Sequence, residues 1–228
     1  MLPLRDEIPT KRVPIITIII ILLNCLVYFY QFFMIKDLHY FVYSYGLIPY
    51  EITKGVSLVP SVSTPIQLTV FSSMFMHGSL VHLAGNMLYL WIFGNNVEDF
   101  LGKLRFIIFY VLSGIFAALG QIIVSPNSTV PMIGSSGAIA GVLGAYLILF
   151  PRARITTLVF FGFFIRLVKL PAIFFLGLWI IYQFLYGLTE VSLSGGGAGV
   201  AWFAHIGGFV GGIILIKLLS PRKNYYSR

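Results

Sequence analysis

Charged residues are scarce in this sequence. Only 10% of its 228 residues are Asp, Glu, Lys or Arg, whereas soluble domains carry roughly 25%. Apolar residues make up 58% of the chain, and the mean hydropathy is +0.94. This composition argues against a soluble domain and indicates a protein that crosses a membrane several times.

Cysteine and acidic residues are also scarce. The single cysteine, Cys25, cannot form a disulfide within the chain. No histidine is followed by Glu, so the His-Glu-x-x-His zinc motif is missing. An aspartyl intramembrane protease needs paired aspartates within its spans, and a Ser-His-Asp triad needs one acid there. Both are disfavoured, because every acidic residue lies in a loop or at the end of an apolar run: Asp6, Glu7, Asp37, Glu51, Glu98, Asp99 and Glu190.

What the sequence has instead is long apolar runs. A membrane-spanning helix needs about 20 apolar residues, with about 17 as the lower limit. We therefore expect an all-α polytopic membrane protein with an N-terminal segment at 1–13, a membrane domain at 14–219 and a C-terminal tail at 220–228. The candidate spans are residues 14–35, 81–97, 104–124, 136–150, 171–188 and 203–219.

The fourth run is too short to cross the bilayer. It ends before Pro151, and at about 1.5 Å per residue it covers roughly 22 Å of a roughly 30 Å hydrocarbon core. One of its ends must therefore stop inside the membrane. The end that carries Ser136 is the better candidate, because Arg152 and Arg154 anchor the other end at the interface.

The basic residues orient the six spans. All of them except Lys36 and Lys54 fall on the side that holds both termini, and the positive-inside rule makes that side cytoplasmic. A seventh span through 155–170, which carries Arg166 and Lys169, would spread the positive charge over both sides. We therefore expect this segment to be a hairpin or helix on the membrane surface. The net charge of +8 then reflects topology, and no nucleic-acid partner is predicted.

A cluster of small residues opens the fourth run, at Gly134-Ser-Ser136-Gly137. Ser136 would lie at a helix N-terminus, whose free N–H groups and positive dipole favour a developing oxyanion. Gly134 and Gly137 allow a substrate to approach closely. Taken alone, such a cluster is more often a helix-packing surface.

A histidine inside the sixth run favours a catalytic role for this cluster over a packing role, because polar residues within a membrane are candidates for function. His205 is followed by several glycines, including Gly208. Helices with small-residue faces pack with their backbones nearly touching, so the fourth and sixth helices can bring His205 against Ser136. We expect a catalytic dyad in which His205 is first the general base and then the general acid.

Two further polar residues share one face of the second span, since His82 and Asn86 are spaced i, i+4. Both can donate hydrogen bonds, as an oxyanion hole requires. The alternative is a polar contact between helices. His77, in the preceding loop, is expected to be an interfacial histidine with a weaker, substrate-facing role.

Together these motifs resemble the rhomboid family of intramembrane serine proteases, and the resemblance covers nearly the whole chain. It implies a six-helix bundle with a Ser136–His205 dyad below the outer membrane surface, and His82, Asn86 and the Ser136 N–H as oxyanion donors. It also implies residence in the cell membrane, single-span membrane proteins as substrates, and no metal or organic cofactor. The stretches that carry it are His77-Gly-Ser-Leu-Val-His82-Leu-Ala-Gly-Asn86, Gly134-Ser-Ser136-Gly-Ala and Ala204-His205-Ile-Gly-Gly208-Phe-Val-Gly-Gly212.

The sequence departs from the family beside the expected dyad, and it leaves two alternatives open. Some members carry an aromatic residue four positions after the serine, against the histidine; Ala140 stands there, so another group must orient His205. A rhomboid-like protein that binds membrane clients without cutting them would be expected to lack Ser136 or His205. A small-solute transporter also uses broken helices and intramembrane polar residues, but the chain has no internal repeat.

Overall fold

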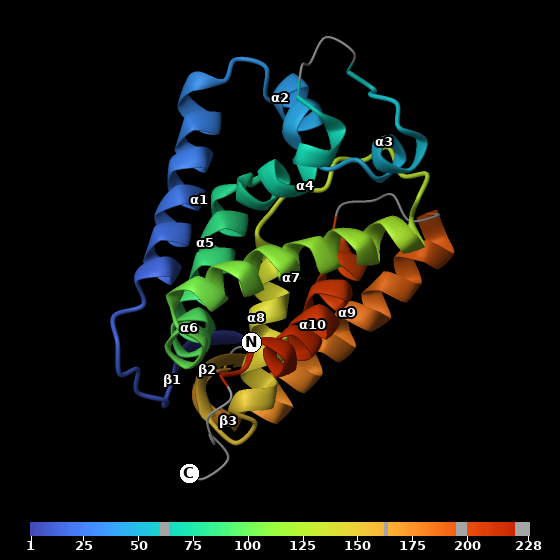
Figure 1. Cartoon of the computed structure of the whole chain (residues 1–228). Helices are drawn as coiled ribbons and strands as arrows, with labels where there is room; N and C mark the ends of the chain where they lie inside the picture. Colours follow the sequence, from blue (N-terminus) through green and yellow to red (C-terminus); the bar gives the residue numbers. More distant parts are fainter. Residues whose placement is uncertain (60–63, 162–163, 195–199, 222–228) are drawn as a thin grey trace.

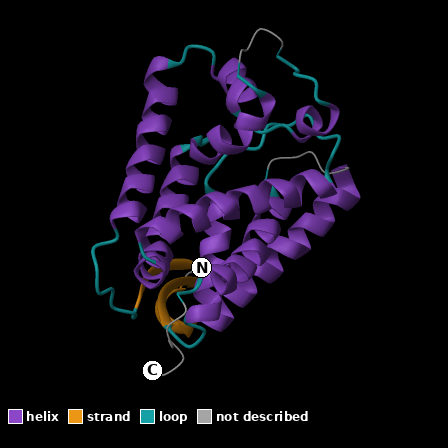
Figure 2. Ribbon diagram, in the orientation of Figure 1, coloured by secondary structure: helices purple, strands orange, loops and turns teal. Residues whose placement is uncertain are grey.

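The computed structural model describes residues 1–59, 64–161, 164–194 and 200–221. Figures 1 and 2 show a bundle of helices with a small sheet at one end. The principal helices are α1 (Ile15–Met34), α5 (Leu80–Tyr89), α6 (Asn95–Leu101), α7 (Lys103–Val124), α8 (Ser136–Leu149), α9 (Ala172–Ser194) and α10 (Trp202–Leu219).

Short helical segments fill the connections. The π-helical turn η3 (Leu90–Gly94) joins α5 to α6 without a break. The long connection between α1 and α5 contains α2 (Leu38–Tyr45), α3 (Pro49–Lys54), η1 (Ile66–Leu68), α4 (Thr69–Ser72) and η2 (Ser73–Phe75).

Among the described residues, four helices are long and apolar enough to cross a membrane, namely α1, α7, α9 over Ala172–Val191, and α10. Shorter apolar helices cover Ile66–Phe75 and α8. The chain is therefore a mostly helical membrane protein. Helices also lie over each of the six predicted spans, because the segment from α5 to α6 covers the second and α8 the fourth. That all six cross the membrane stays a prediction.

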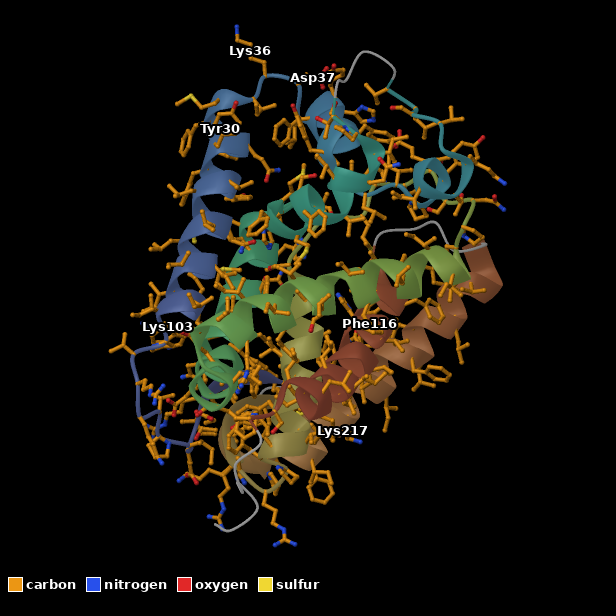
Figure 3. All side chains as sticks on the ribbon, in the orientation of Figure 1. Tyr30, Lys36, Asp37, Lys103, Phe116 and Lys217 are labelled. Atoms are coloured by element: carbon orange, nitrogen blue, oxygen red, sulfur yellow. The ribbon has the colours of Figure 1, made fainter. Side chains whose placement is uncertain are left out.

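The charged ends of the bundle lie far apart. Figure 3 shows Lys36 and Asp37 at the top of the view, beyond the end of α1, with Lys103 well below them and Lys217 lower still. The predicted topology requires this separation of Lys36 from the other two lysines. The orientation of the termini relative to a membrane stays a prediction.

The central element is α8. Every residue from 137 to 146 is buried, and the helix contacts α5, η3, α6, α7, α9 and α10. Figure 1 shows it in the middle of the bundle, with α7 crossing in front of it. A helix that is apolar all round is suited to such a buried position. Its first residue, Ser136, is therefore carried on the most enclosed element of the fold.

The expectation of an all-α protein is wrong in one respect. The strands β1 (Leu2–Asp6), β2 (Arg154–Phe161) and β3 (Phe164–Pro171) form an antiparallel sheet in the order β1-β2-β3. The segment 155–170 is thus the hairpin of the two predicted alternatives. Its β-branched and aromatic residues favour strands, and Ile155 and Thr157 are buried while Arg154 is exposed. The strand from the N-terminal segment pairs with a partner distant in sequence, which no local pattern indicates.

The N-terminal strand is tied to the far end of α8. The Tyr146 hydroxyl donates to Asp6 Oδ2 at 2.6 Å, and the Asn96 amide donates to the same oxygen at 2.7 Å. Burial raises the pKa of Asp6 above its ordinary value of 3.8, and these hydrogen bonds oppose the rise. The end of α8 opposite Ser136 is therefore held by a partly buried acid.

Glu98 holds the start of α1. It is buried and accepts from the backbone N–H of Ile16 at 3.0 Å and of Thr17 at 2.7 Å, and from the Thr17 hydroxyl at 2.7 Å. The free N–H groups of a helix N-terminus are satisfied in this way by a side chain from another element. α1 and α6 are thereby fixed to each other.

Candidate active site

Ser136 is the first residue of α8, and the loop before it is shaped by Gly134. Gly134 has φ +125°, a left-handed conformation that residues with a Cβ rarely adopt, and its N–H donates to the Ser73 carbonyl at 2.9 Å. Ser135 then precedes the helix. The N–H groups of the first turn of a helix have no partner within the helix. Ser136 is therefore surrounded by backbone donors with a positive dipole.

His205 lies in the first turn of α10 and contacts this serine. Its Nε2 is 2.8 Å from Ser136 Oγ, and both side chains are half-buried. At this distance the hydroxyl can donate its proton to an unprotonated Nε2. The two residues predicted to form a dyad are thus brought into hydrogen-bond contact.

Glycines allow α8 and α10 to approach closely enough for this contact. A Cβ added to Gly208 would overlap the carbonyl oxygen of Gly137, and one added to Gly212 would overlap that of Gly141. On its other side α10 meets α7, where a Cβ on Gly207 would stand 2.6 Å from the Phe116 carbonyl oxygen. The backbones touch on both sides of α10, as small-residue interfaces permit.

His82 faces the loop before the serine. It lies in the first turn of α5, where its N–H donates to the side chain of Ser79 at 3.1 Å. A Cβ on Gly134 would come within 2.9 Å of His82 Cε1 and 3.0 Å of its Nε2. The imidazole therefore occupies the space that a side chain at Gly134 would need.

Asn86 contacts His77, which no pattern in the sequence indicated. The Asn86 amide nitrogen is 2.9 Å from His77 Nε2, and Ser135 Oγ is 3.3 Å from the same atom. His77 is only 1% exposed, so the expectation of an interfacial, substrate-facing histidine is wrong. Its backbone N–H donates to Gln31 of α1 at 3.3 Å, which draws the ring inward. His77 thus supports Asn86 and Ser135.

The residue that orients His205 is Gln183, which the motifs in the sequence did not single out. Gln183 of α9 has its Oε1 2.7 Å from His205 Nδ1, and its side chain is 4% exposed. Ala140 is fully buried within α8, and the side chain that contacts His205 Nδ1 comes from α9 instead. The signal in the sequence was a glutamine inside an apolar span, a residue type that is costly there and marks function or a polar contact.

These residues enclose a cavity of about 300 Å³. The candidate site residues Ser136, His205, His82 and Asn86 all line it. Its remaining wall is largely apolar and includes many small residues: Val70, Ser73, Met74, Gly114, Ala117, Ala118, Met132, Ile133, Gly134, Gly137, Ala138, Val200, Ala201 and Ala204. Within the part of the chain that the structure describes, no three His, Cys, Asp or Glu side chains are grouped so as to hold a metal ion.

A comparison with known protein families agrees with the resemblance seen in the sequence motifs. The rhomboid domain matches residues 66–222, which is most of the chain and includes every residue of the candidate site. The chain belongs to the rhomboid family. The family that the sequence motifs suggested is thereby confirmed.

Relatives come from fungi, bacteria and plants. Rhomboid protein 1, mitochondrial, of Saccharomyces cerevisiae is 30% identical over 157 residues, which are 65% of this chain and 40% of the relative. Rhomboid protease GluP of Bacillus subtilis is 31% identical over 154 residues, 68% of this chain and 26% of the relative. RHOMBOID-like protein 5 of Arabidopsis thaliana is 30% identical over 159 residues, which are 68% of this chain and 46% of the relative. The matched region is thus less than half of each of these rhomboid relatives.

Proposed function

We propose that this rhomboid protein is an intramembrane serine endopeptidase. The observation that carries the proposal is the 2.8 Å contact between Ser136 Oγ and His205 Nε2, at a helix N-terminus that opens into a cavity. A serine needs a base to become a useful nucleophile, and here the base is within reach of its proton. The relative from Bacillus subtilis that is named a rhomboid protease supports the same reading.

In the first half of the reaction, Ser136 Oγ attacks the carbonyl carbon of the scissile peptide while its proton passes to His205 Nε2. The tetrahedral intermediate then collapses, and the proton moves from Nε2 to the leaving amine. The C–N bond breaks and an ester to Ser136 remains. In the second half His205 Nε2 takes a proton from water while the water oxygen attacks the ester carbonyl carbon. The bond between that carbon and Ser136 Oγ then breaks, the proton passes from Nε2 to Oγ, and the carboxylic acid product leaves.

The oxyanion of each intermediate requires donors that are already in position. The candidates are the Ser136 backbone N–H, the ring of His82 and the amide of Asn86. One N–H of Asn86 is engaged with His77, and the amide carries a second. Because Asn86 lines the same cavity as Ser136, we assign that second N–H to the oxyanion of a bound substrate.

The substrates we propose are single-span membrane proteins. The cavity walls are mainly apolar and small, which suits an extended segment with small side chains at the cut. A peptide bond within an intact helix is shielded by its own hydrogen bonds, so the substrate must unwind locally, and helix-destabilising residues lower that cost. We further propose residence in the cell membrane, six crossings over the residue ranges predicted above, and cytoplasmic termini.

The test is cleavage of a single-span reporter with a Gly/Ala-rich membrane segment, using purified protein in liposomes. Wild type is expected to cut it and Ser136→Ala is not. Ser113→Ala is the matched control, because Ser113 is a buried serine on α7 outside the cavity lining; it should cut at the wild-type rate. Equal cleavage by wild type and Ser136→Ala would contradict the proposal. Saturable binding of the reporter without any cleavage would indicate a client-binding protein.

A further inference from the structure

The second ring nitrogen of His205 is held by a helix that carries neither the nucleophile nor the base. Gln183 lies in α9, and its Oε1 is 2.7 Å from His205 Nδ1. On the same helix Ile181 and Leu185 expose 55% and 56% of their surface. Gln183 is 4% exposed. The glutamine thus lies on the inner face of a helix whose other face is open.

The contact of Gln183 Oε1 with His205 Nδ1 bears on the tautomer of the imidazole. A neutral imidazole has one N–H, and the nitrogen without it is the acceptor. To take the proton of Ser136, Nε2 must be the acceptor, so the ring hydrogen must be on Nδ1. Nδ1–H then needs an acceptor of its own, and Gln183 Oε1 is at hydrogen-bond distance. The opposite tautomer would put N–H toward the serine and leave the base without function.

Aromatic rings complete the setting of His205. The ring of Trp179, also on α9, has its centroid 5.9 Å from that of His205, and Trp202 lies edge-on at 6.4 Å. These contacts restrict the plane of the imidazole, while the hydrogen bond to Gln183 selects its tautomer. α9 therefore contributes two of the groups that orient His205, Trp179 and Gln183.

We infer that Gln183 is a positioning residue that keeps His205 in the Nδ1–H tautomer, so that the base is competent only while α9 is docked on α10. The inference rests on the proposed function of the Ser136–His205 pair. In the triad of soluble serine proteases a carboxylate holds the histidine. Here a neutral amide does so, which avoids placing a charge in a membrane span. A substrate segment that displaced α9 would release His205 until the helix returned.

The test compares three variants in detergent micelles and liposomes. Gln183→Leu removes the acceptor with an apolar residue of similar size. Gln183→Glu restores an acceptor oxygen at the same position. Gln121→Leu is the matched control, because Gln121 is another buried glutamine, on α7, which accepts from the Ala204 N–H at 3.3 Å and does not contact the His205 ring.

Two readouts separate positioning from structure. The first is the 15N spectrum of histidine-labelled protein, in which the His205 signal is identified by its loss in His205→Phe. Wild type, Gln183→Glu and Gln121→Leu should give an Nδ1–H imidazole, and Gln183→Leu a mixture of tautomers. The second is reporter cleavage, where Gln183→Leu should lower kcat about 10- to 100-fold with little change in KM, and Gln183→Glu should recover most of the rate.

Three outcomes would overturn the inference. An unchanged tautomer in Gln183→Leu would mean that the glutamine does not select it, whatever happens to the rate. A higher KM with unchanged kcat would assign Gln183 to substrate binding. A mixed tautomer in Gln121→Leu as well would make the effect a general consequence of loosened helices. The spectrum requires no turnover, so failure of wild type to cleave any reporter would contradict the proposed function and leave the tautomer result standing.

Discussion

The face that α10 presents to α8 and the face that it presents to α9 are built differently. Toward α8 it offers Gly208 and Gly212, and the backbones of the two helices are in contact. Toward α9 it offers His205 and Phe209, and the contact is made by side chains. Trp179 packs on both, with ring centroids 5.9 Å and 6.1 Å away, and Gln183 adds a hydrogen bond.

The difference separates two tasks of the site. A backbone contact has no rotamers to lose and leaves no room for adjustment, so the α8/α10 interface fixes the distance between Ser136 and His205. Side-chain contacts can part and re-form without distorting either helix, so the α9/α10 interface can set the orientation of His205 and still allow α9 to move. The nucleophile and base belong to the rigid part, and the group that orients the base belongs to the adjustable part.

The largest effect is expected from Gly208→Ala, which breaks the rigid interface. The new Cβ would overlap the Gly137 carbonyl oxygen, and a backbone atom in a packed helix cannot move aside. The free energy of unfolding should fall by about 1–3 kcal/mol, and reporter cleavage should be abolished as the helices separate. Unfolding in mixed micelles and cleavage in liposomes measure the two effects.

The matched control for that variant is Gly177→Ala in α9, where a Cβ meets nothing within 4 Å. Alanine is preferred to glycine in a helix by about 1 kcal/mol, so this variant should be as stable as wild type or more so. Full activity of Gly208→Ala would mean that the close packing of α8 on α10 is not needed for catalysis.

The next largest effect is expected from Gly134→Ala, in the loop that joins the rigid interface to the oxyanion donors. The backbone at φ +125° strains any residue with a Cβ, and the methyl group would press on His82. We expect turnover to fall by about 10²–10³-fold with a stability loss of about 1–3 kcal/mol. Gly78→Ala, whose Cβ would make an ordinary 3.8 Å contact with Ile133, should behave as wild type. Comparable rates for both variants would remove His82 from the oxyanion site.

Asn86→Ala tests the donor that His77 supports. It should lower kcat by about 10- to 1,000-fold without unfolding the protein, because an oxyanion donor acts mainly in the transition state. His77→Phe should have a smaller effect in the same direction, since it removes the acceptor that orients the Asn86 amide and leaves the amide itself. Wild-type turnover of Asn86→Ala would count against the oxyanion role.

The smallest effect concerns the end of α8 opposite Ser136, where Tyr146 donates to Asp6. Burial raises the pKa of Asp6 above 3.8, so folding favours the protonated acid. The stability that this group contributes is present below pH 3.8 and is lost as pH rises through its raised pKa. Relative to Asp6→Asn, which does not titrate, wild type should therefore lose stability between acid and neutral pH, by less than about 1 kcal/mol in this partly solvated site. A pH-independent difference between the two proteins in mixed micelles would contradict this.

The sequence indicated Ser136 and His205 as a pair, but it did not indicate the residues that orient the site, Gln183 and His77. Ser136 and His205 stand out because polar residues are rare in apolar runs, and the glycines beside them indicate close helices. Gln183 also lies in such a run, yet its role depends on which way α9 faces, which its nearly uniform apolar surroundings do not reveal. The strand Leu2–Asp6 has too few residues for a periodic pattern and pairs with 155–158, far along the chain. Local sequence patterns therefore could not predict contacts between segments that only the tertiary structure brings together.

The most direct test of the central claim is covalent labelling of the purified protein with a fluorophosphonate, followed by peptide mapping. Such a reagent modifies a serine only when a base has activated it. The account predicts an adduct on Ser136 in wild type, none on the neighbouring Ser135, and none on Ser136 in His205→Ala. An adduct on a different serine, or equal labelling of Ser136 with and without His205, would contradict the Ser136–His205 dyad.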